Sequence, residues 1–316
     1  MDLRDIRTIF YGTSTFGIPA AEWLLKNTNL VAVITTPDKP VGREQEFLGS
    51  SVKQWARDNK DLNILQPEGL KDEGLNDVLA DLSPDLALVA DYGKIIPGTV
   101  LDIPKYKTLN LHVSLLPKYR GASPMQTAIL NGEKVSGVTL FVLEPKLDTG
   151  PIIAQKEIVL EPKESFETLH KKSASLSAEL LNEYLGLYVR GEIKPKPQDH
   201  SQATYTKIFS KEDGRIDWQK SAEQIERMIR ALNPWPGTWS NLVGLLPGDK
   251  TKLVKIFQAN LSDKELSPGE TFTQNDKLFV GTGDGALEVH ELQIEGGKRL
   301  TTSQFLKGVR NKITFT

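Results

Sequence analysis

The sequence of 316 residues contains no cysteine, and this absence removes several kinds of chemistry at once. The chain cannot form disulfides, use a thiolate nucleophile, or hold zinc or an iron–sulfur cluster through cysteine. Its four histidines, at positions 112, 170, 200 and 290, show neither His-x-x-x-His nor His-x-x-Glu spacing. We therefore expect no metal site.

Long hydrophobic runs are also missing, and no stretch approaches the ~18 apolar residues that cross a membrane. The first residues, Met-Asp-Leu-Arg-Asp-Ile, carry acidic groups where a signal peptide is basic and then apolar. We therefore expect a cytoplasmic chain with no membrane partner. Neither sign of charge dominates, because 39 Lys and Arg stand against 41 Asp and Glu. Any nucleic acid must therefore be bound by local patches.

The first half of the chain alternates short apolar runs with helix-like segments. The runs lie at residues 8–12, 30–34, 86–90, 108–112 and 138–142. Such runs, separated by helical segments, are typical of buried strands in a parallel sheet that is covered on both faces. The pattern predicts a doubly wound, mostly parallel α/β domain, whose ligands lie at the carboxyl ends of its strands.

The second half changes character after a long amphipathic helix, which the spacing of leucines predicts at residues 166–189. Residues 191–206 are polar and contain proline, which is the composition of a linker. We therefore expect a first domain at residues 1–190, a linker at 191–206 and a second domain at 207–316.

The second domain is predicted to be smaller and rich in strands. One helix at residues 221–232 is followed by strand-like runs at 253–257, 278–280 and 287–292, with turn residues between them. Short strands at this spacing favour a small β-barrel.

The turn after the first predicted strand, Gly12-Thr-Ser-Thr-Phe-Gly17, occupies the place of a phosphate-binding loop. A P-loop needs Lys and then Ser or Thr after its last glycine, and Ile18-Pro19 stands there instead. The segment also lacks the G-x-G-x-x-G spacing of a dinucleotide-binding fold. We interpret it as a tight strand-to-helix turn, which disfavours a dehydrogenase.

Two polar residues lie at the end of an apolar strand, in the segment Asn110-Leu-His-Val-Ser-Leu-Leu-Pro117. Side chains alternate between the faces of a strand, so Asn110 and His112 point to one face and their apolar neighbours to the other. A lone histidine is more often a satisfied structural residue, and an asparagine at a strand end often closes a turn. The pair, followed by an irregular loop, favours a site at the carboxyl edge of the sheet, because buried polar groups are costly without partners.

A carboxylate follows in Lys146-Leu-Asp-Thr-Gly150, between a strand that ends near Leu143 and one that starts at Pro151. Asp-Thr-Gly is a common turn sequence and by itself a weak signal. If these two strands are neighbours in the sheet, we expect the turn to lie at the same edge as His112.

Asn110, His112 and Asp148 together suit acyl transfer by direct attack of an amine. The tetrahedral intermediate carries an oxyanion that needs hydrogen-bond donors, which Asn110 and a protonated His112 can supply. Asp148 can stabilise the imidazolium and accept the proton of the amine, directly or through water. No cysteine and no G-x-S-x-G serine is present, so a covalent acyl-enzyme is not favoured.

With these residues the chain resembles the folate-dependent formyltransferases, whose active-site pattern is Asn-x-His, then Ser-Leu-Leu-Pro, and later Leu-Asp-Thr-Gly. Further segments narrow the resemblance to the methionyl-tRNA formyltransferase family, and the resemblance covers nearly the whole chain. These segments are Phe10-Tyr-Gly-Thr-Ser-Thr-Phe16, Pro37-Asp-Lys-Pro-Val-Gly-Arg43, Tyr92-Gly-Lys-Ile-Ile-Pro97, Ser210-Lys-Glu-Asp-Gly-Arg-Ile-Asp-Trp218, Arg230-Ala-Leu-Asn-Pro-Trp-Pro236 and Gly296-Gly-Lys-Arg-Leu300.

The resemblance implies an enzyme that moves the formyl group of 10-formyltetrahydrofolate to the α-amine of methionine on the initiator tRNA, for translation initiation. It implies a catalytic role for Asn110, His112 and Asp148, and it assigns catalysis to residues 1–190 and tRNA binding to residues 207–316. We expect such an enzyme to act as a monomer without a metal. The folate is placed against Ser114, Leu115, Leu116, Pro117, Tyr92, Ile95 and Ile96.

For the last three of these residues, the ordinary core of a buried strand end is an equally good interpretation. Asn233-Pro-Trp-Pro236 is expected to form a packed turn and not a substrate contact.

The loop after Arg43 departs from the bacterial pattern. Relatives usually carry a basic stretch there that meets the tRNA acceptor stem, whereas this chain has Glu44-Gln-Glu-Phe-Leu48. Acidic residues near phosphates are expected to weaken binding and reduce its salt dependence. Phe47 offers stacking on a base instead, and Arg43 is predicted to contact the tRNA.

Two other functions stay open at this point. The same transfer to a sugar-nucleotide amine or to glycinamide ribotide is the nearest alternative, and the β-rich second domain argues against it. A tRNA-binding protein without enzymatic activity is the alternative from another class. The presence of Asn110, His112 and Asp148 speaks against it.

Overall fold

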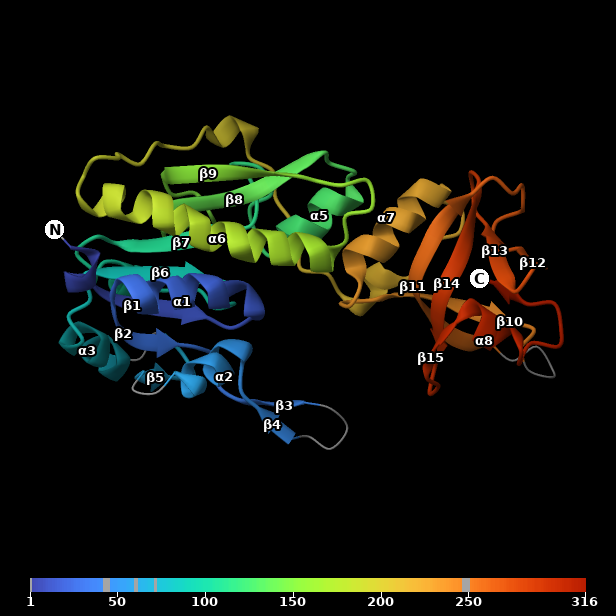
Figure 1. Cartoon of the computed structure of the whole chain (residues 1–316), viewed down its shortest axis with the longest axis horizontal. Helices are drawn as coiled ribbons and strands as arrows, with labels where there is room; N and C mark the ends of the chain where they lie inside the picture. Colours follow the sequence, from blue (N-terminus) through green and yellow to red (C-terminus); the bar gives the residue numbers. More distant parts are fainter. Residues whose placement is uncertain (1, 42–45, 60–61, 71–72, 246–250) are drawn as a thin grey trace. The chain divides into compact units, whose positions relative to one another are not determined.

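The computed structural model describes residues 2–41, 46–59, 62–70, 73–245 and 251–316. The chain divides into two compact units (Figure 1). The first contains Met1–Pro124, Val135–Val159 and Leu169–Thr206, and the second contains Met125–Lys134, Leu160–Thr168 and Lys207–Thr316. Two short segments that precede residue 170 therefore belong to the second unit.

The first unit is built on a sheet of seven strands in the order β5-β2-β1-β6-β7-β8-β9. The strands from β5 to β7 are parallel, and β8 and β9 are antiparallel. The bounds are β1 Arg7–Gly12, β2 Asn29–Ile34, β5 Ile64–Leu65, β6 Leu86–Ala90, β7 Thr108–His112, β8 Val135–Val142 and β9 Ile152–Val159.

Helices cover both faces of this sheet, which is why its central strands are buried along almost their whole length. Ile9 and Tyr11 pack on one face with Leu79 of α3 and Val100 of α4. On the other face α1 and α6 run beside each other (Figure 1), joined by a hydrogen bond from Trp23. The helices are α1 Ile18–Asn27, α2 Ser51–Asp58, α3 Glu73–Asp81, α4 Gly98–Leu101, α5 Pro124–Leu130 and α6 Phe166–Val189.

The second unit is an antiparallel sheet in the order β12-β13-β14-β11-β10-β16, with β15 paired to β14. A bridge between Glu270, just before β12, and Thr314 of β16 brings the two edges together, so the sheet is nearly a closed barrel. The elements are α7 Ala222–Leu232, β10 Thr238–Val243, β11 Lys252–Ser262, β12 Thr271–Gln274, β13 Lys277–Gly281, β14 Ala286–Ile294, β15 Arg299–Thr301, α8 Thr302–Leu306 and β16 Thr314–Phe315. The predicted fold class is thus confirmed.

The helix α7 closes the core of the second unit. Ser221 caps it, with its side chain accepting from the backbone of Gln224 while the Gln224 side chain accepts from the backbone of Ser221. Ile225 and Ile229 then face Ile256 of β11 in one apolar cluster. The amphipathic sequence of this helix is therefore explained by its single buried face.

The sequence analysis did not predict the short elements between β2 and β6. β3 (Lys39–Val41) and β4 (Glu46–Leu48) form a two-stranded ladder in which Pro40 pairs with Phe47. Phe47 is 72% exposed, so it belongs to no core. Within the described ranges, no helix is long and apolar enough to cross a membrane.

Residues 191–206, which have the composition of a linker, lie against the first unit. Lys196 pairs with Ile152 at the start of β9, and Tyr205 pairs with Arg120 in the loop after β7. The polar side chains that make this segment look like a linker are partly used in hydrogen bonds to these neighbours.

Neighbouring residues on β11 offer a test of the second core, because they point to opposite faces. Ile256 is fully buried, whereas Lys255 is exposed. Ile256→Ala is expected to lower the free energy of unfolding by about 2–5 kcal/mol, because it removes buried methyl groups and leaves a cavity. Lys255→Ala is expected to change it by less than about 0.5 kcal/mol. Urea unfolding followed by circular dichroism checks both, and equal midpoints would contradict the assignment.

Candidate active site

The strand β7 carries the first two candidate residues. Asn110 and His112 lie two positions apart and therefore point to the same face of the sheet. His112 is 6% exposed, whereas Asn110 is half-buried. Within the parts of the chain that the structure describes, the Asn110 side chain makes no hydrogen bond, so its amide is available to a ligand.

The imidazole of His112 is held between two acceptors. Its Nε2 lies 2.9 Å from the carbonyl oxygen of Tyr119. A carbonyl can only accept, so Nε2 carries a proton and donates it to this bond. Nδ1 is then the nitrogen that can take up or release a proton, and it lies 3.7 Å from Oδ2 of Asp148. At this distance the two side chains are in contact but are not hydrogen-bonded.

Asp148 reaches His112 by an unexpected route. In the pairing of β7 with β8, Val142 lies opposite Leu109 and Thr139 lies opposite His112. The turn after β8 therefore starts level with the amino end of β7, not at its carboxyl end as expected, because β8 is antiparallel to β7. The turn then returns toward His112.

The geometry of this turn fixes the Asp148 carboxylate. Asp148 has a φ of +49°, in the left-handed region that side chains rarely adopt. Its Oδ2 accepts a hydrogen bond of 2.7 Å from the N–H of Gly121, in the loop after β7. At Gly150, a Cβ would lie 1.8 Å from the carbonyl oxygen of Val142, so only glycine fits there. The carboxylate is only 7% exposed.

The loop that follows β7 is fixed by a single buried threonine. Oγ1 of Thr139 donates to the carbonyl of Ser114 at 2.6 Å and accepts from the N–H of Leu116 at 3.2 Å. Nε2 of Gln155 donates to the same Oγ1 at 2.9 Å and to the carbonyl of Leu116 at 2.9 Å. The loop is therefore anchored to β8 and β9 next to His112.

The predicted folate residues of this loop fall into two groups. Ser114 and Leu116 are buried, and the Ser114 hydroxyl donates to the carbonyl of Lys118 at 2.7 Å. Leu115 and Pro117 are half-buried and can contact a ligand.

The segment after β6 divides in the same way. Ile95 is 89% exposed, whereas Tyr92 and Ile96 lie in the core below the sheet edge. The Tyr92 ring meets the edge of Tyr11 at 5.4 Å, and burial raises the pKa of Tyr92 to about 12. Burial, with a smaller contribution from Tyr92, also raises the pKa of Tyr11. Both phenols therefore stay neutral, and Ile95 is the residue of this segment that a ligand can touch.

Some groups that bear on the site were not found from the sequence, and one predicted residue cannot be placed. Arg43, predicted to contact tRNA, lies outside the described residues. Arg120 and Gln198, by contrast, are buried beside the Asp148 turn. Arg120 sits in a loop between tyrosine and glycine, and Gln198 in a polar stretch, so neither carries a sequence signal of burial.

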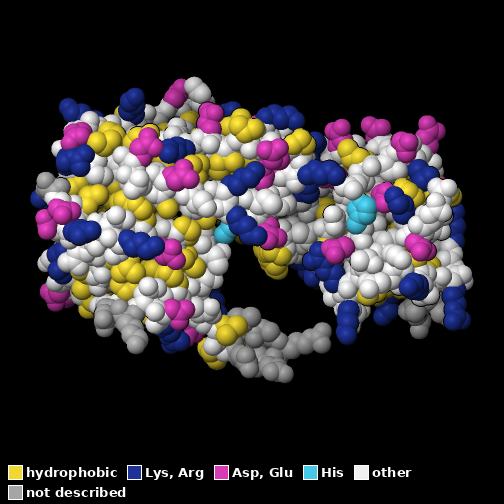
Figure 2. All heavy atoms as spheres, viewed as in Figure 1, with side chains coloured by type: hydrophobic (Ala, Val, Ile, Leu, Met, Phe, Trp, Pro, Cys, Tyr) yellow, Lys and Arg dark blue, Asp and Glu magenta, His cyan; other side chains and the backbone are white. Residues whose placement is uncertain are grey.

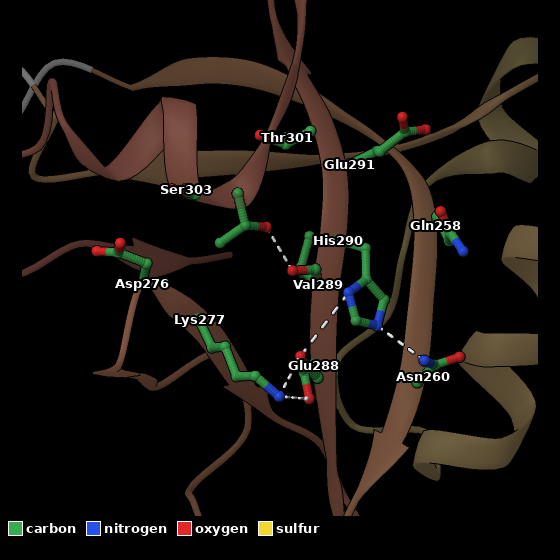
Figure 3. A pocket seen from close by; sticks show the side chains of 11 residues that line it. Gln258, Asn260, Asp276, Lys277, Glu288, Val289, His290, Glu291, Thr301 and Ser303 are labelled. Atoms are coloured by element: carbon green, nitrogen blue, oxygen red, sulfur yellow. Dashed lines mark hydrogen bonds and ion pairs between the residues drawn. The ribbon is translucent and has the colours of Figure 1, made fainter.

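Elsewhere, the second unit has a hollow of about 450 Å³ over β11, β13 and β14 (Figure 3). Its polar side chains pair with one another. Nδ2 of Asn260 lies 2.8 Å from Nε2 of His290, and Lys277 pairs with Glu288 at 3.1 Å. No cluster of His, Asp or Glu able to hold a metal occurs among the residues that the structure describes.

Comparisons with protein families identify the class to which the chain belongs. A model described as Formyl transferase matches residues 9–185, and one described as Formyl transferase, C-terminal domain, matches residues 208–310. The chain therefore belongs to the formyl transferase family, and the predicted class of enzyme is confirmed.

Relatives that match nearly the whole chain are named methionyl-tRNA formyltransferase. The one from Thermodesulfovibrio yellowstonii is 39% identical over 95% of this chain and 95% of its own length. The one from Hydrogenobaculum sp. is 41% identical over 98% of this chain and 99% of its own length. The narrower resemblance drawn from the sequence is confirmed by these relatives.

Solved structures share the fold at lower identity. An N-formyltransferase from Helicobacter canadensis, solved with folinic acid and dTDP-3-aminofucose, matches 93% of this chain and 100% of its own, with a TM-score of 0.64 and 19% identity. HypX from Aquifex aeolicus, in complex with tetrahydrofolic acid, matches 96% of this chain and 48% of its own, with a TM-score of 0.65 and 21% identity. At this identity the likeness shows the fold alone.

His112→Asn and Asp148→Asn test the catalytic cluster. Each is expected to lower the rate of formyl transfer by roughly 100-fold or more, because each removes a group that accepts or stabilises the transferred proton. Single-turnover kinetics measure the rate, and circular dichroism checks that the fold is kept. Folded variants with near-normal turnover would remove both residues from the mechanism.

Proposed function

We propose that this chain transfers the formyl group of 10-formyltetrahydrofolate to the α-amine of methionine on the initiator tRNA. The contact of His112 with Asp148, on the same face as the free amide of Asn110, is the observation that carries the proposal. Full-length relatives named for this reaction support it. The acceptor is used in translation, so we place the reaction in the cytoplasm.

The donor carries a flat pterin ring, and apolar side chains that can pack on the faces of such a ring are available at this end of the sheet. Ile95 and Leu147 are 89% and 59% exposed, and Leu115 and Pro117 of the loop are half-buried. Apolar walls with a few placed polar groups are the usual lining of such sites. These residues fit the folate, and the carbonyl oxygen of its formyl group would need a donor such as Asn110.

The reaction follows from the roles of three side chains. The lone pair of the amine attacks the formyl carbon, and the negative charge on oxygen is stabilised by the Asn110 amide and by protonated Nδ1 of His112. The proton of the new ammonium passes to Asp148, directly or through water. The bond from the formyl carbon to the folate nitrogen then breaks, and that nitrogen takes a proton from His112.

All three of these side chains come from one chain. We therefore propose that a single copy of the protein is sufficient for catalysis.

We assign tRNA binding to the second unit, residues 207–316. Charges of both signs are interspersed over the visible face of this unit (Figure 2), so a local patch must provide the binding. Several of its basic groups are used internally: Lys207 pairs with Asp213, Arg299 with Glu291 and Lys312 with Glu270. By contrast, Lys211, Arg215 and Lys220 are exposed and form no ion pair among the described residues.

Aromatic side chains accompany these unpaired cations. The Arg215 guanidinium lies 5.9 Å from the centre of the Trp239 ring, and Trp239 donates to the carbonyl of Lys211 at 2.9 Å. In the turn after α7, Pro236 is buried as expected, but Trp235 is 66% exposed. Cations interleaved with exposed rings are typical of surfaces that bind unpaired nucleotides.

An acceptor assay tests the proposed reaction. With 10-formyltetrahydrofolate as donor, the protein is expected to form formylmethionine on charged initiator tRNA. It is expected to leave a dTDP-amino sugar and glycinamide ribotide unmodified at the same concentration. Mass spectrometry of the products measures all three, and preferential formylation of either small amine would replace the proposal.

The basic patch is tested by replacing Lys211, Arg215 and Lys220 together by alanine. We expect weaker tRNA binding and a slope of log K against log salt that is shallower by about 0.7–0.9 for each phosphate that the variant no longer neutralises. A control that removes the same number of positive charges replaces Lys26, near the end of α1, and Lys105 and Lys107, which lie just before β7. Unchanged slopes in both variants, measured by filter binding, would move the interface elsewhere.

A further inference from the structure

The loop after β7 buries a positive charge that has no acidic partner. Arg120 is 1% exposed and leads the fully buried side chains by volume. A guanidinium stays charged in proteins, and burying a charge without a partner is costly. Among the described residues no carboxylate pairs with it, and its Nε has no partner at all. The guanidinium is held by neutral groups instead, and it also lies 6.0 Å from the centre of the Tyr205 ring.

Arg120 instead fixes the orientation of a buried amide. Its Nη2 donates to Oε1 of Gln198 at 2.7 Å and to Nδ1 of His200 at 2.9 Å. A guanidinium only donates, so Oε1 of Gln198 must face it and the amide cannot be reversed. Nε2 of Gln198 is therefore directed away from Arg120 and donates to the carbonyls of Asp148 and Gly150, at 2.8 and 2.7 Å.

The result is a continuous connection from a buried charge to the active-site carboxylate. Gln198 holds the backbone on both sides of Thr149, where Asp148 adopts its left-handed conformation. Gly121, the residue after Arg120, donates its N–H to the Asp148 carboxylate. Tyr119, the residue before it, accepts from His112. Three consecutive residues therefore orient both members of the catalytic pair.

The end of the segment at residues 191–206 holds the first two of these residues, Tyr119 and Arg120. Oγ1 of Thr204 accepts from the N–H of Tyr119 at 2.8 Å, and its carbonyl accepts from the N–H of Arg120 at 2.9 Å. Thr206 donates its N–H to the carbonyl of Arg120 at 2.8 Å. Because these bonds come from backbone and short side chains, they leave little freedom for the loop.

We propose that Arg120 and Gln198 are positioning residues for formyl transfer, which act by holding the Asp148 turn against His112. The proposal rests on the proposed function of the cluster. Both side chains are buried, with Arg120 1% and Gln198 7% exposed. Each is needed because Asp148 must meet both the imidazole and the incoming amine.

Gln198→Leu removes both hydrogen bonds to the turn at nearly constant volume. We expect kcat to fall roughly 10- to 100-fold, since a small displacement of a catalytic group has effects of this size. KM for donor and tRNA should stay within about threefold, because the substrate contacts are intact. Gln202→Leu, the same change at an exposed position of the same segment, should have no effect.

Gln198→Glu separates the positioning role from charge balance. It keeps an acceptor for Arg120 and adds a negative charge, but it sets an oxygen against the carbonyls of Asp148 and Gly150. The rate should fall as in Gln198→Leu. A normal rate in Gln198→Glu would mean that Gln198 only neutralises Arg120, and it would overturn the proposal.

A double-mutant cycle with Asp148→Asn distinguishes positioning from general damage. In that background Gln198→Leu should lower kcat by less than about twofold, because the residue it positions is already inactive. An equal fold-decrease in kcat in both backgrounds would assign Gln198 a structural role and contradict the proposal.

The environment of the His112 ring can be measured by NMR even when formyl transfer cannot be followed. The imidazole ¹⁵N shifts of His112 at fixed pH should move in Gln198→Leu toward those of Asp148→Asn, and stay unchanged in Gln202→Leu. Inactive wild-type protein would reject the proposed function alone, whereas unmoved shifts in Gln198→Leu would reject the positioning role.

Discussion

The hydrogen bond from the Gly121 N–H to the Asp148 carboxylate joins two stretches of chain that would otherwise have no reason to meet. One is the loop that leaves the sheet after His112, and the other is the turn between two antiparallel strands that returns across the sheet. A carboxylate with so little exposure needs such a donor, because desolvation without hydrogen bonds would be prohibitive. The geometry of the candidate site thus depends on a hydrogen bond to one buried carboxyl group.

The strands of the first unit position the loop and the turn that this hydrogen bond joins. The five parallel strands bring the ends of β6 and β7 to a common edge, so that His112 and the exposed Ile95 come from neighbouring strands. The antiparallel strands β8 and β9 supply Thr139 and Gln155, which anchor the loop from behind. The helices on both faces of the sheet exclude water from its central strands.

Local patterns in the sequence predicted the elements well, because apolar runs and helical periodicity are properties of adjacent residues. The long helix α6 begins and ends where its leucine spacing indicated, and β6 and β7 match their predicted runs residue for residue. Asn110 and His112 could be paired because strand alternation is also local. The route of Asp148 could not, since the direction of β8 depends on pairing.

Burial of polar residues was harder to predict than the elements themselves. The burial of Arg120 and Gln198 was not predicted from the sequence. The two residues lie 78 positions apart, and both are of types that are usually exposed. Tyr92 and Ile96 show the converse. Both are of types that suit a ligand contact, but their side chains are buried in the core of the first unit.

Thr206 stands immediately before Lys207, the residue at which the second unit resumes, and Thr204 lies two residues earlier. The hydrogen bonds from this segment to the loop after β7 are therefore complete by Thr206, although the family model for the first half ends at residue 185. An exchange of the chain at residue 190 would therefore also replace Thr204 and Thr206, whose hydrogen bonds hold the loop at Tyr119 and Arg120.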